Sequence, residues 1–560
     1  MSNCAWMRTI PSEGRIASVP LSIESLMPPY LASHLHLAAL TIFIAATANA
    51  DETAPISTHD GIIKGVVENG VQVFKGIPYA SPPVKELRWM PPQPVEPWDG
   101  SRQCNEFGAA CPQIPNSLYK TGQTQLKMSE DCLYLNVWTP SLDKGKRLPV
   151  MVWIHGGGNV SGSGHQPTYD GANLAQNGVV LVTINYRLGR FGFFAHPLLS
   201  EESASGTSGN YGILDQIQAL KWVQQNIQQF GGDPNNVTIF GESAGGVDCT
   251  VLMLSPLAKG LFHRVIAQSG TTLMSRRFLD RKSGEASSGH EAGELLVEDW
   301  LGDSSHSLSR LRSLTSAQLL RSQSGGGIPN PRKNPRALGV LIDGYVLPEE
   351  PHVLLAKGDF NQVPLMIGMN TDESTLFTQK IRFFFPAGYR RMLGDHFPGS
   401  VEDVFSQYPG NSGKEATQSF KQLMSDSMFL QPGREFADYV SGHGAPVYFY
   451  VFGRTPPFAA RAGLGAFHAL EIGYVFENLD AQNPRLFGAT DRALSSKMSA
   501  YWRSFATSGT PNETDLPTWP RYDAKQAKYL HFDETVSVKS EYRQPEYQLL
   551  KRLKASTRRN

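Results

Sequence analysis

The segment that most constrains this chain is residues 237–246, which read Val-Thr-Ile-Phe-Gly-Glu-Ser-Ala-Gly-Gly. A short apolar run, typical of a strand, ends in Gly-x-Ser-x-Gly, and a helix-compatible segment follows. In so tight a turn, a side chain flanking the serine would collide with a neighbouring strand or helix, and Gly241 and Gly245 avoid that clash. We therefore predict a strained strand–turn–helix that exposes the Ser243 hydroxyl at the carboxyl edge of a sheet.

Apolar runs alternate with amphipathic ones through the chain. Residues 149–154 and 179–184 are typical of strands buried on both faces, and 61–65, 71–74, 265–267 and 446–451 are further strand candidates. Residues 213–230 show the apolar spacing of one helix, which Asp-Pro-Asn at 233–235 should end. With the serine turn, this order predicts an α/β-hydrolase fold: a large, mostly parallel central sheet flanked by helices. Residues 275–336 are interpreted as inserted helices and loops around the active-site mouth, and residues 551–560 as a frayed tail.

Composition excludes several classes of partner. Lys+Arg and Asp+Glu balance at 51 each, so nothing in the overall charge attracts nucleic acid or anionic membranes. No long internal apolar run could span a bilayer. No Cys-x-x-Cys or Cys/His cluster indicates zinc or redox chemistry, and we expect no cofactor and no metal.

The N-terminus has the pattern of an export signal. An apolar run at 35–46 is short for a membrane span, and Ala-Asn-Ala at 48–50 followed by polar residues resembles a cleavage site. We interpret residues 1–50 as a signal peptide cut after Ala50, although the segment before the apolar run is unusually long. The remaining residues 51–560 are then a single domain, secreted or periplasmic, without a membrane span.

A glycine run provides candidate donors for an oxyanion. His155-Gly156-Gly157-Gly158 directly follows the strand predicted to end at Ile154. Consecutive glycines allow backbone N–H groups to approach a substrate oxygen closely. Gly156 and Gly157, with the N–H of Ala244 after the serine, are the predicted oxyanion hole.

A serine nucleophile needs a base and an acid, which this fold places downstream in the order serine, acid, histidine. Spacing leaves several candidates open. The possible bases are His396, His443, His468 and His531, of which His468 has the most loop-like context; the possible acids are Asp343, Asp372 and Glu373.

Specific motifs decide among these candidates. From about residue 61 to 532 the chain resembles the type B carboxylesterase/cholinesterase family, through Phe-Lys-Gly-Ile-Pro-Tyr-Ala at 74–80, Ser-Glu-Asp-Cys-Leu-Tyr-Leu-Asn-Val at 129–137, Asn-Tyr-Arg-Leu-Gly at 185–189, Gly-Asn-Tyr-Gly at 209–212, Phe-Gly-Glu-Ser-Ala-Gly-Gly at 240–246 and Trp-Arg-Ser-Phe-Ala at 502–506. The resemblance implies Ser243 as nucleophile, Glu373 as acid and His468 as base, with the oxyanion hole as above.

The resemblance implies structural features as well. It predicts a disulfide between Cys111 and Cys132, and we expect Cys104 and Cys249 to be unpaired; Cys4 would leave with the signal. It also implies an Arg88–Glu130 salt bridge.

The chain departs from the family pattern at a few positions. Ala469 replaces the usual glycine after the base, and Asp248 on the helix after the serine is an unusual charge, which we expect to be paired in the core. The loop between Cys111 and Cys132 contains Tyr119 but lacks the tryptophan on which cholinesterases stack a quaternary ammonium.

Together these features predict a general serine carboxylesterase that hydrolyses small-molecule esters through an acyl-enzyme. Two alternatives are a catalytically dead binding protein of the same fold, which the complete triad disfavours, and a hydrolase of another bond or of lipid esters. Oligomeric state stays open.

Overall fold

A computed structural model describes residues 51–114, 126–274, 277–284, 286–302, 307–321, 336, 338–481 and 483–559. The predicted signal peptide, Cys4 and Tyr119 lie outside the described residues.

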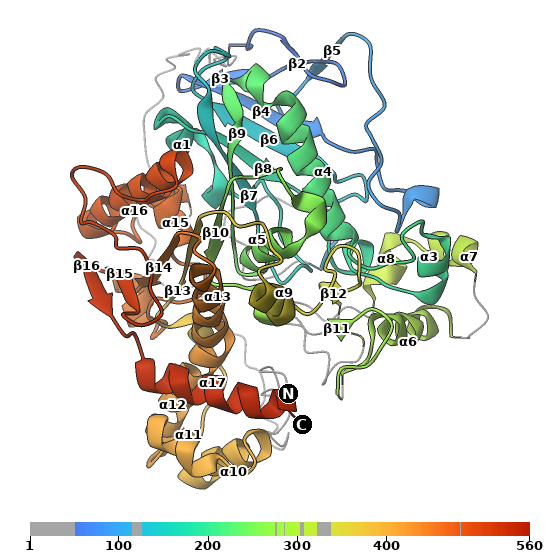
Figure 1. Ribbon diagram of the computed structural model, residues 1–560. Helices are drawn as coiled ribbons and strands as arrows, with labels where there is room; N and C mark the ends of the chain where they lie inside the picture. The colour runs from blue at the N-terminus through green and yellow to red at the C-terminus, as the bar shows by residue number, and fades with distance from the viewer. Residues whose placement is uncertain are drawn as a thin grey trace, which may run out of the picture.

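An eleven-stranded sheet forms the centre of the molecule (Figure 1). From one edge to the other its strands are β16 (Val536–Ser540), β15 (Lys528–Phe532), β14 (Val447–Phe452), β13 (Leu365–Asn370), β10 (Arg264–Gln268), β9 (Gly232–Glu242), β7 (Leu148–Ile154), β8 (Val180–Ile184), β6 (Tyr134–Thr139), β4 (Val71–Pro78) and β3 (Val66–Glu68). Neighbouring strands from β15 to β8 are all parallel, whereas β16, β6, β4 and β3 pair antiparallel. The predicted mostly parallel α/β-hydrolase sheet is therefore confirmed.

Helices cover both faces of this sheet because its inner strands are apolar on both. In β7, Val150, Val152 and Ile154 belong to one core cluster, and Met151 and Trp153 belong to the opposite one. The first cluster is covered by α4 (Tyr211–Asn226), α5 (Ala244–Leu254), α9 (Pro351–Lys357) and α13 (Gln431–Gly442). The second is covered by α1 (Ala172–Gln176), α15 (Ile472–Val475) and α16 (Ala489–Ser508).

A third, smaller cluster lies beside the sheet among α10 (Pro386–His396), α11 (Val401–Gln407), α12 (Gly413–Ser425) and α17 (Gln544–Arg559), in the lower part of Figure 1. The prediction of a frayed C-terminal tail was wrong, since α17 runs through it. Lys554 Nζ donates to Glu435 Oε2 at 2.7 Å, and Lys551 Nζ lies 3.1 Å from Asp438 Oδ2. These ion pairs anchor the basic residues of α17 to α13.

The helix before the nucleophile strand ends earlier than predicted. Asp-Pro-Asn at 233–235 lies inside β9, and α4 continues only as a short 3₁₀ turn, Ile227–Phe230. Gly231 then adopts φ +76°, the left-handed conformation that ends helices and that glycine adopts without strain. The helix is therefore ended by Gly231, and not by the proline of Asp-Pro-Asn.

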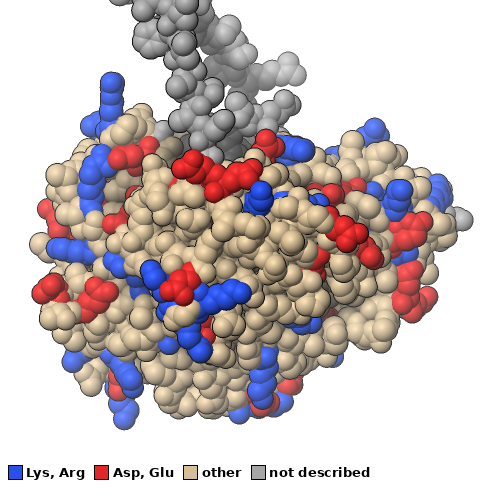
Figure 2. Space-filling model, turned by 90° about the horizontal axis from the view of Figure 1, so that it is seen from above, with Lys and Arg blue, Asp and Glu red and all other residues tan. Residues whose placement is uncertain are grey.

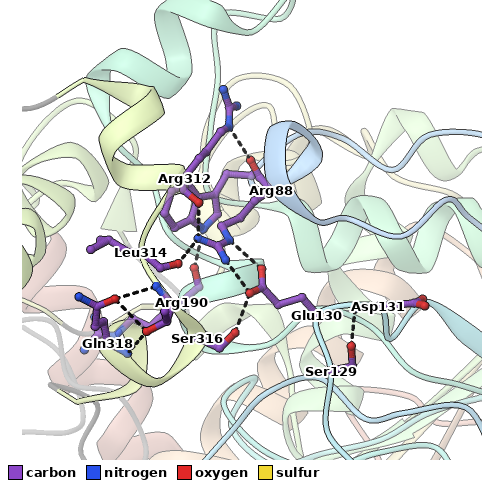
Figure 3. A network of polar contacts seen from close by, with 11 residues as sticks. Arg88, Ser129, Glu130, Asp131, Arg190, Arg312, Leu314, Ser316 and Gln318 are labelled. Atoms are coloured by element: carbon purple, nitrogen blue, oxygen red, sulfur yellow. Dashed lines mark hydrogen bonds and ion pairs between the residues drawn. The ribbon is translucent and has the colours of Figure 1, made fainter.

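The inserted segment contributes α6 (Gly289–Leu301), α7 (Leu308–Arg312) and α8 (Ser316–Leu320), on the right of Figure 1. The predicted salt bridge holds this segment to the body of the protein (Figure 3). Arg88 binds both carboxylate oxygens of Glu130, at 2.6 and 2.7 Å, and donates to the carbonyls of Arg312 and Leu314. Ser316 Oγ also donates to Glu130.

The predicted Cys111–Cys132 disulfide is not formed in the structure, where both residues are buried free thiols. The two side chains are hydrogen-bonded to each other, and this contact together with burial raises the pKa of Cys132 well above its usual range. Cys111 Sγ also accepts the backbone N–H of Leu188 at 3.2 Å. Cys104 and Cys249 are free and buried, as expected.

The surface is mixed in charge on the face seen in Figure 2, where basic and acidic side chains are interspersed. Among the described helices, none combines the length and the apolar character that a bilayer crossing requires.

A buried ion pair supports the packing of α4 on the sheet, and we predict that it is essential for stability. Arg187 binds both oxygens of Asp215, at 2.6 and 2.8 Å, with 2% and 0% of their side chains exposed. Asp215→Asn keeps the shape but leaves the guanidinium charge uncompensated, so it should lower the free energy of unfolding by roughly 3–5 kcal/mol. Urea denaturation would measure the loss.

The matched control is the exposed pair between Arg390 and Glu402, in which Glu402 is 77% exposed. Glu402→Gln should change stability by less than about 1 kcal/mol, because water screens that pair. Equal losses in the two variants would contradict a special role for the buried pair.

Candidate active site

The turn at Ser243 has the strained geometry that its sequence predicted. β9 ends at Glu242, α5 begins at Ala244, and Ser243 between them has φ 57° and ψ −120°. A Cβ added to Gly245 would lie 2.0 Å from the carbonyl oxygen of Ile154, and one added to Gly241 would lie 2.6 Å from Gly245. Only glycine fits at both positions. The close approach of β7, β9 and α5 therefore determines where the serine side chain lies.

The glycine run lies directly against this turn. A Cβ on Gly156 would approach Ser243 Cβ to 3.1 Å, and Gly157 has φ +113°. Within the described residues, the backbone N–H groups of Gly156 and Gly157 donate no hydrogen bond to the protein. Two unpaired N–H groups beside a serine hydroxyl can bind a negatively charged oxygen.

Of the four candidate histidines, the structure brings only His468 to an acidic candidate. His468 Nδ1 lies 2.5 Å from Glu373 Oε2, and both side chains are buried. His396 and His443 instead bind backbone carbonyls, those of Met392 and Leu355, and His531 Nδ1 contacts Lys539.

The other two acidic candidates have structural partners. Asp343 accepts the backbone N–H groups of residues 345–347 and so closes a turn. Asp372 accepts from Thr371 and from the backbone of Ala466, so it braces the loop that carries the histidine.

A second carboxylate contacts the imidazole, which the sequence reasoning missed. Glu242, the residue before the serine, places Oε1 3.1 Å from His468 Nε2. Burial alone would lower the pKa of His468, but the negative charges of Glu242 and Glu373 raise it to about 9. Burial in turn raises the pKa of Glu242 well above its usual range. The sequence signal for this contact was that the variable residue before the serine in Gly-x-Ser-x-Gly is a glutamate.

A third buried carboxylate, Glu471, lies behind the histidine. It accepts Gln268 Nε2 at 3.0 Å and Asn370 Nδ2 at 2.7 Å, and Trp502 Nε1 donates to the other end of Gln268. Through these amides, helix α16 and strands β10 and β13 support the loop that carries His468.

Two aromatic rings flank the imidazole. Phe377 and Phe429 each lie with their ring centres 5.0 Å from that of His468. Phe429 belongs to a π-helical turn, Asp426–Leu430, between α12 and α13, and such turns are frequent at functional sites. The site therefore has an apolar wall beside the imidazole of His468.

The structure shows the conformation or contacts of two residues that depart from the family pattern, Asp248 and Ala469. Asp248 lies in the core, and its hydrogen-bond partners are the uncharged amides of Asn159 and Gln216. Ala469 adopts φ +69°, so the replacement of glycine puts a Cβ in a conformation that glycine favours.

The chain thus has the fold and the serine turn of the α/β-hydrolase class. A model of the carboxylesterase family matches residues 52–550. The chain is 39% identical to fumonisin B1 esterase of Sphingopyxis macrogoltabida (87% of this chain, 88% of that protein) and 37% identical to para-nitrobenzyl esterase of Bacillus subtilis (87% and 96%). Among solved structures, PNB esterase has a TM-score of 0.74 at 35% identity, covering 89% of this chain and 99% of that one. A carboxylesterase of Geobacillus stearothermophilus has a TM-score of 0.73 at 34% identity, covering 89% and 100%.

The chain therefore belongs to the carboxylesterase family, and it is an enzyme of the carboxylic ester hydrolase class.

The contact between Glu242 and His468 generates a pH prediction. Glu242→Gln removes a negative charge 3.1 Å from the imidazole, so the pKa of His468 should fall from about 9 toward its usual value near 6.5. Because a general base acts in its neutral form, the rising limb of kcat/KM against pH should move to lower pH. A pH–rate profile with a soluble ester measures the shift.

Glu471→Gln serves as the control, since Glu471 also raises the histidine pKa but more weakly. Its rising limb should move less than that of Glu242→Gln. A larger shift in the control would contradict the assignment of Glu242 as the main charge on the histidine.

Proposed function

We propose that this protein is a general serine carboxylesterase that uses Ser243, His468 and Glu373 as a catalytic triad and forms an acyl-enzyme. The observation that carries the proposal is the 2.5 Å contact between His468 and Glu373 beside the strained turn of Ser243. That contact holds the imidazole in the tautomer whose other nitrogen can accept a proton.

The reaction follows from these positions. His468 takes the proton of Ser243 as its oxygen attacks the ester carbonyl, and the N–H groups of Gly156, Gly157 and Ala244 stabilise the tetrahedral oxyanion. The alcohol leaves with the proton that His468 returns. A water molecule activated by the same base then releases the acid and regenerates the serine. No step requires a cofactor.

The favoured substrates are small, uncharged carboxylic esters. Phe377 and Phe429 give the histidine an apolar surround suited to acyl or aryl groups. The segment 111–132 contains no tryptophan on which a quaternary ammonium could stack, so choline esters are disfavoured. The relatives named for fumonisin B1 and para-nitrobenzyl esters support an ester substrate without specifying which one.

Substitution of the triad should abolish hydrolysis of aryl acetate, butyrate and octanoate esters. Ser243→Ala should lower kcat by about 10³-fold or more, because no other group can form the acyl-enzyme. Glu373→Gln should lower kcat by roughly 10²–10⁴-fold, because the imidazole loses its orienting charge. Steady-state kinetics across the ester series would also show the acyl length that the pocket accepts.

Asp343→Asn is the matched control, since Asp343 was an equal candidate by sequence order but its carboxylate closes a turn of the backbone. It should leave kcat within about threefold of the wild type. Turnover that persists in Ser243→Ala, or no turnover of any ester by the wild type, would contradict the proposed mechanism.

We also propose that residues 1–50 direct export and are removed after Ala50, which leaves residues 51–560 as one catalytic domain in the periplasm or medium. The apolar run at 35–46 and the Ala-Asn-Ala site support this proposal. Expression of the full chain in a bacterial host should yield exported protein whose first residue is Asp51. Cytoplasmic protein that retains residues 1–50 would contradict it, as N-terminal sequencing would reveal.

A further inference from the structure

The carboxyl group of Asp248 is fully buried on the nucleophile helix, and its hydrogen-bond partners among the described residues are uncharged. Its Oδ1 accepts Asn159 Nδ2 at 2.9 Å, and its Oδ2 accepts Gln216 Nε2 at 2.6 Å. Within the described part of the chain, no ion pair involves Asp248. A carboxylate kept in the core without a cation is costly, which calls for an explanation beyond packing.

Asn159 connects this carboxyl group to the glycine run. It follows Gly156–Gly158 directly and adopts φ 58°, a conformation uncommon for a residue with a side chain. Its backbone oxygen accepts the N–H of Gly189 at 2.7 Å, and its Oδ1 accepts the Tyr186 hydroxyl at 3.0 Å. The same hydroxyl oxygen lies 2.7 Å from the carbonyl oxygen of His155, so its single proton is shared between two acceptors. Both ends of the glycine run are therefore held by one hydrogen-bond network.

We propose that Asp248 is a positioning residue of the oxyanion hole, which fixes the glycine run relative to the nucleophile helix through Asn159. This inference rests on the proposed function. The carboxylate orients the Asn159 amide, and that amide holds the strained backbone from which the N–H groups of Gly156 and Gly157 project. Because Asp248 lies on α5 and Ser243 is the residue that caps the start of this helix, one rigid element sets both the donors and the attacking oxygen.

The ionisation of Asp248 should therefore be visible in catalysis near neutral pH. Burial raises its pKa to about 7, against the lowering effect of Asn159 and Gln216. Among titratable groups, Cys249 on α5 interacts electrostatically with Asp248. Tyr186 is connected to Asp248 through Asn159, and Asp215, next to Gln216 on α4, is neutralised by Arg187.

Protonation changes what Asp248 can do for the loop. The ionised group accepts two hydrogen bonds, whereas the protonated group must also donate one. Gln216 Oε1 is buried without a partner and could accept that proton if its amide turned over. Asp248 Oδ1 then still accepts Asn159, but as an atom of a neutral acid and not of a carboxylate, and a charged acceptor makes the stronger hydrogen bond. The contribution of Asp248 to kcat should therefore increase as pH rises through about 7.

Alanine and asparagine substitutions separate positioning from packing. Asp248→Ala should lower kcat on an aryl acetate by roughly 10–100-fold with KM changed less than about threefold, since the oxyanion forms only in the transition state. Asp248→Asn retains a neutral acceptor for Asn159, so its kcat should lie between that of Asp248→Ala and that of the ionised wild type, and the pH step near 7 should be absent. Cys249→Ala, at the adjacent buried position on α5, should leave kcat and the pH step unchanged.

A double-mutant cycle tests whether Asp248 acts through Asn159. Asn159→Ala alone should resemble Asp248→Ala, and the double variant should be little worse than either single variant. Fully additive losses, or an unchanged kcat in Asp248→Ala with only a lower melting temperature, would overturn the inference. If Asp248→Ala does not fold, an unaltered pH profile in Asp248→Asn overturns the pH link, and an unaltered kcat in Asn159→Ala overturns the positioning role.

The inference and the proposed function fail in different ways. An active wild type whose Asp248 and Asn159 variants are equally active contradicts this inference alone. A wild type inactive on every ester contradicts both.

Discussion

The closeness of the backbones around Ser243 is the constraint on which the rest of the site depends. A single added carbon at residue 245 would lie 2.0 Å from the carbonyl oxygen of Ile154, so β7, β9 and α5 meet without any side chain between them. This contact strains the serine backbone and at the same time brings the glycine run after β7 beside it. The position of Ser243 and that of the glycine run, the proposed nucleophile and oxyanion donors, are therefore set by the same packing, and neither can be moved independently.

Buried charges have different partners in the supporting scaffold of the protein and around His468. In the scaffold, two carboxylates face cations: the buried Asp215 faces Arg187, and the half-buried Glu130 faces Arg88. Around His468 the buried carboxylates Glu242, Glu373 and Glu471 outnumber the single group that can carry a positive charge. Such an excess of one sign in a buried place is unfavourable for stability, and it shifts pKa values in the way that catalytic sites require.

Prediction succeeded where local patterns carried the information. Apolar runs identified β7 and β8, and the glycines of the Gly-x-Ser-x-Gly segment identified the turn. Patterns failed where contacts with distant residues decided the outcome. The C-terminal helix α17 is held by the ion pair between Lys554 and Glu435. The thiols of Cys111 and Cys132 are hydrogen-bonded to each other and do not form the predicted disulfide. The choice of His468 and Glu373 needed family motifs, because spacing alone left four histidines and three acids.

The sequence by itself determined the class of fold, the strained turn at Ser243 and the glycine run, because steric limits on a tight turn are properties of adjacent residues. Only the tertiary structure decided that Glu242 contacts His468 and that Asp248 is linked to the glycine run through Asn159. Those contacts join residues 226 and 89 positions apart, and they exist because parallel strands bring the ends of distant segments to one edge of the sheet.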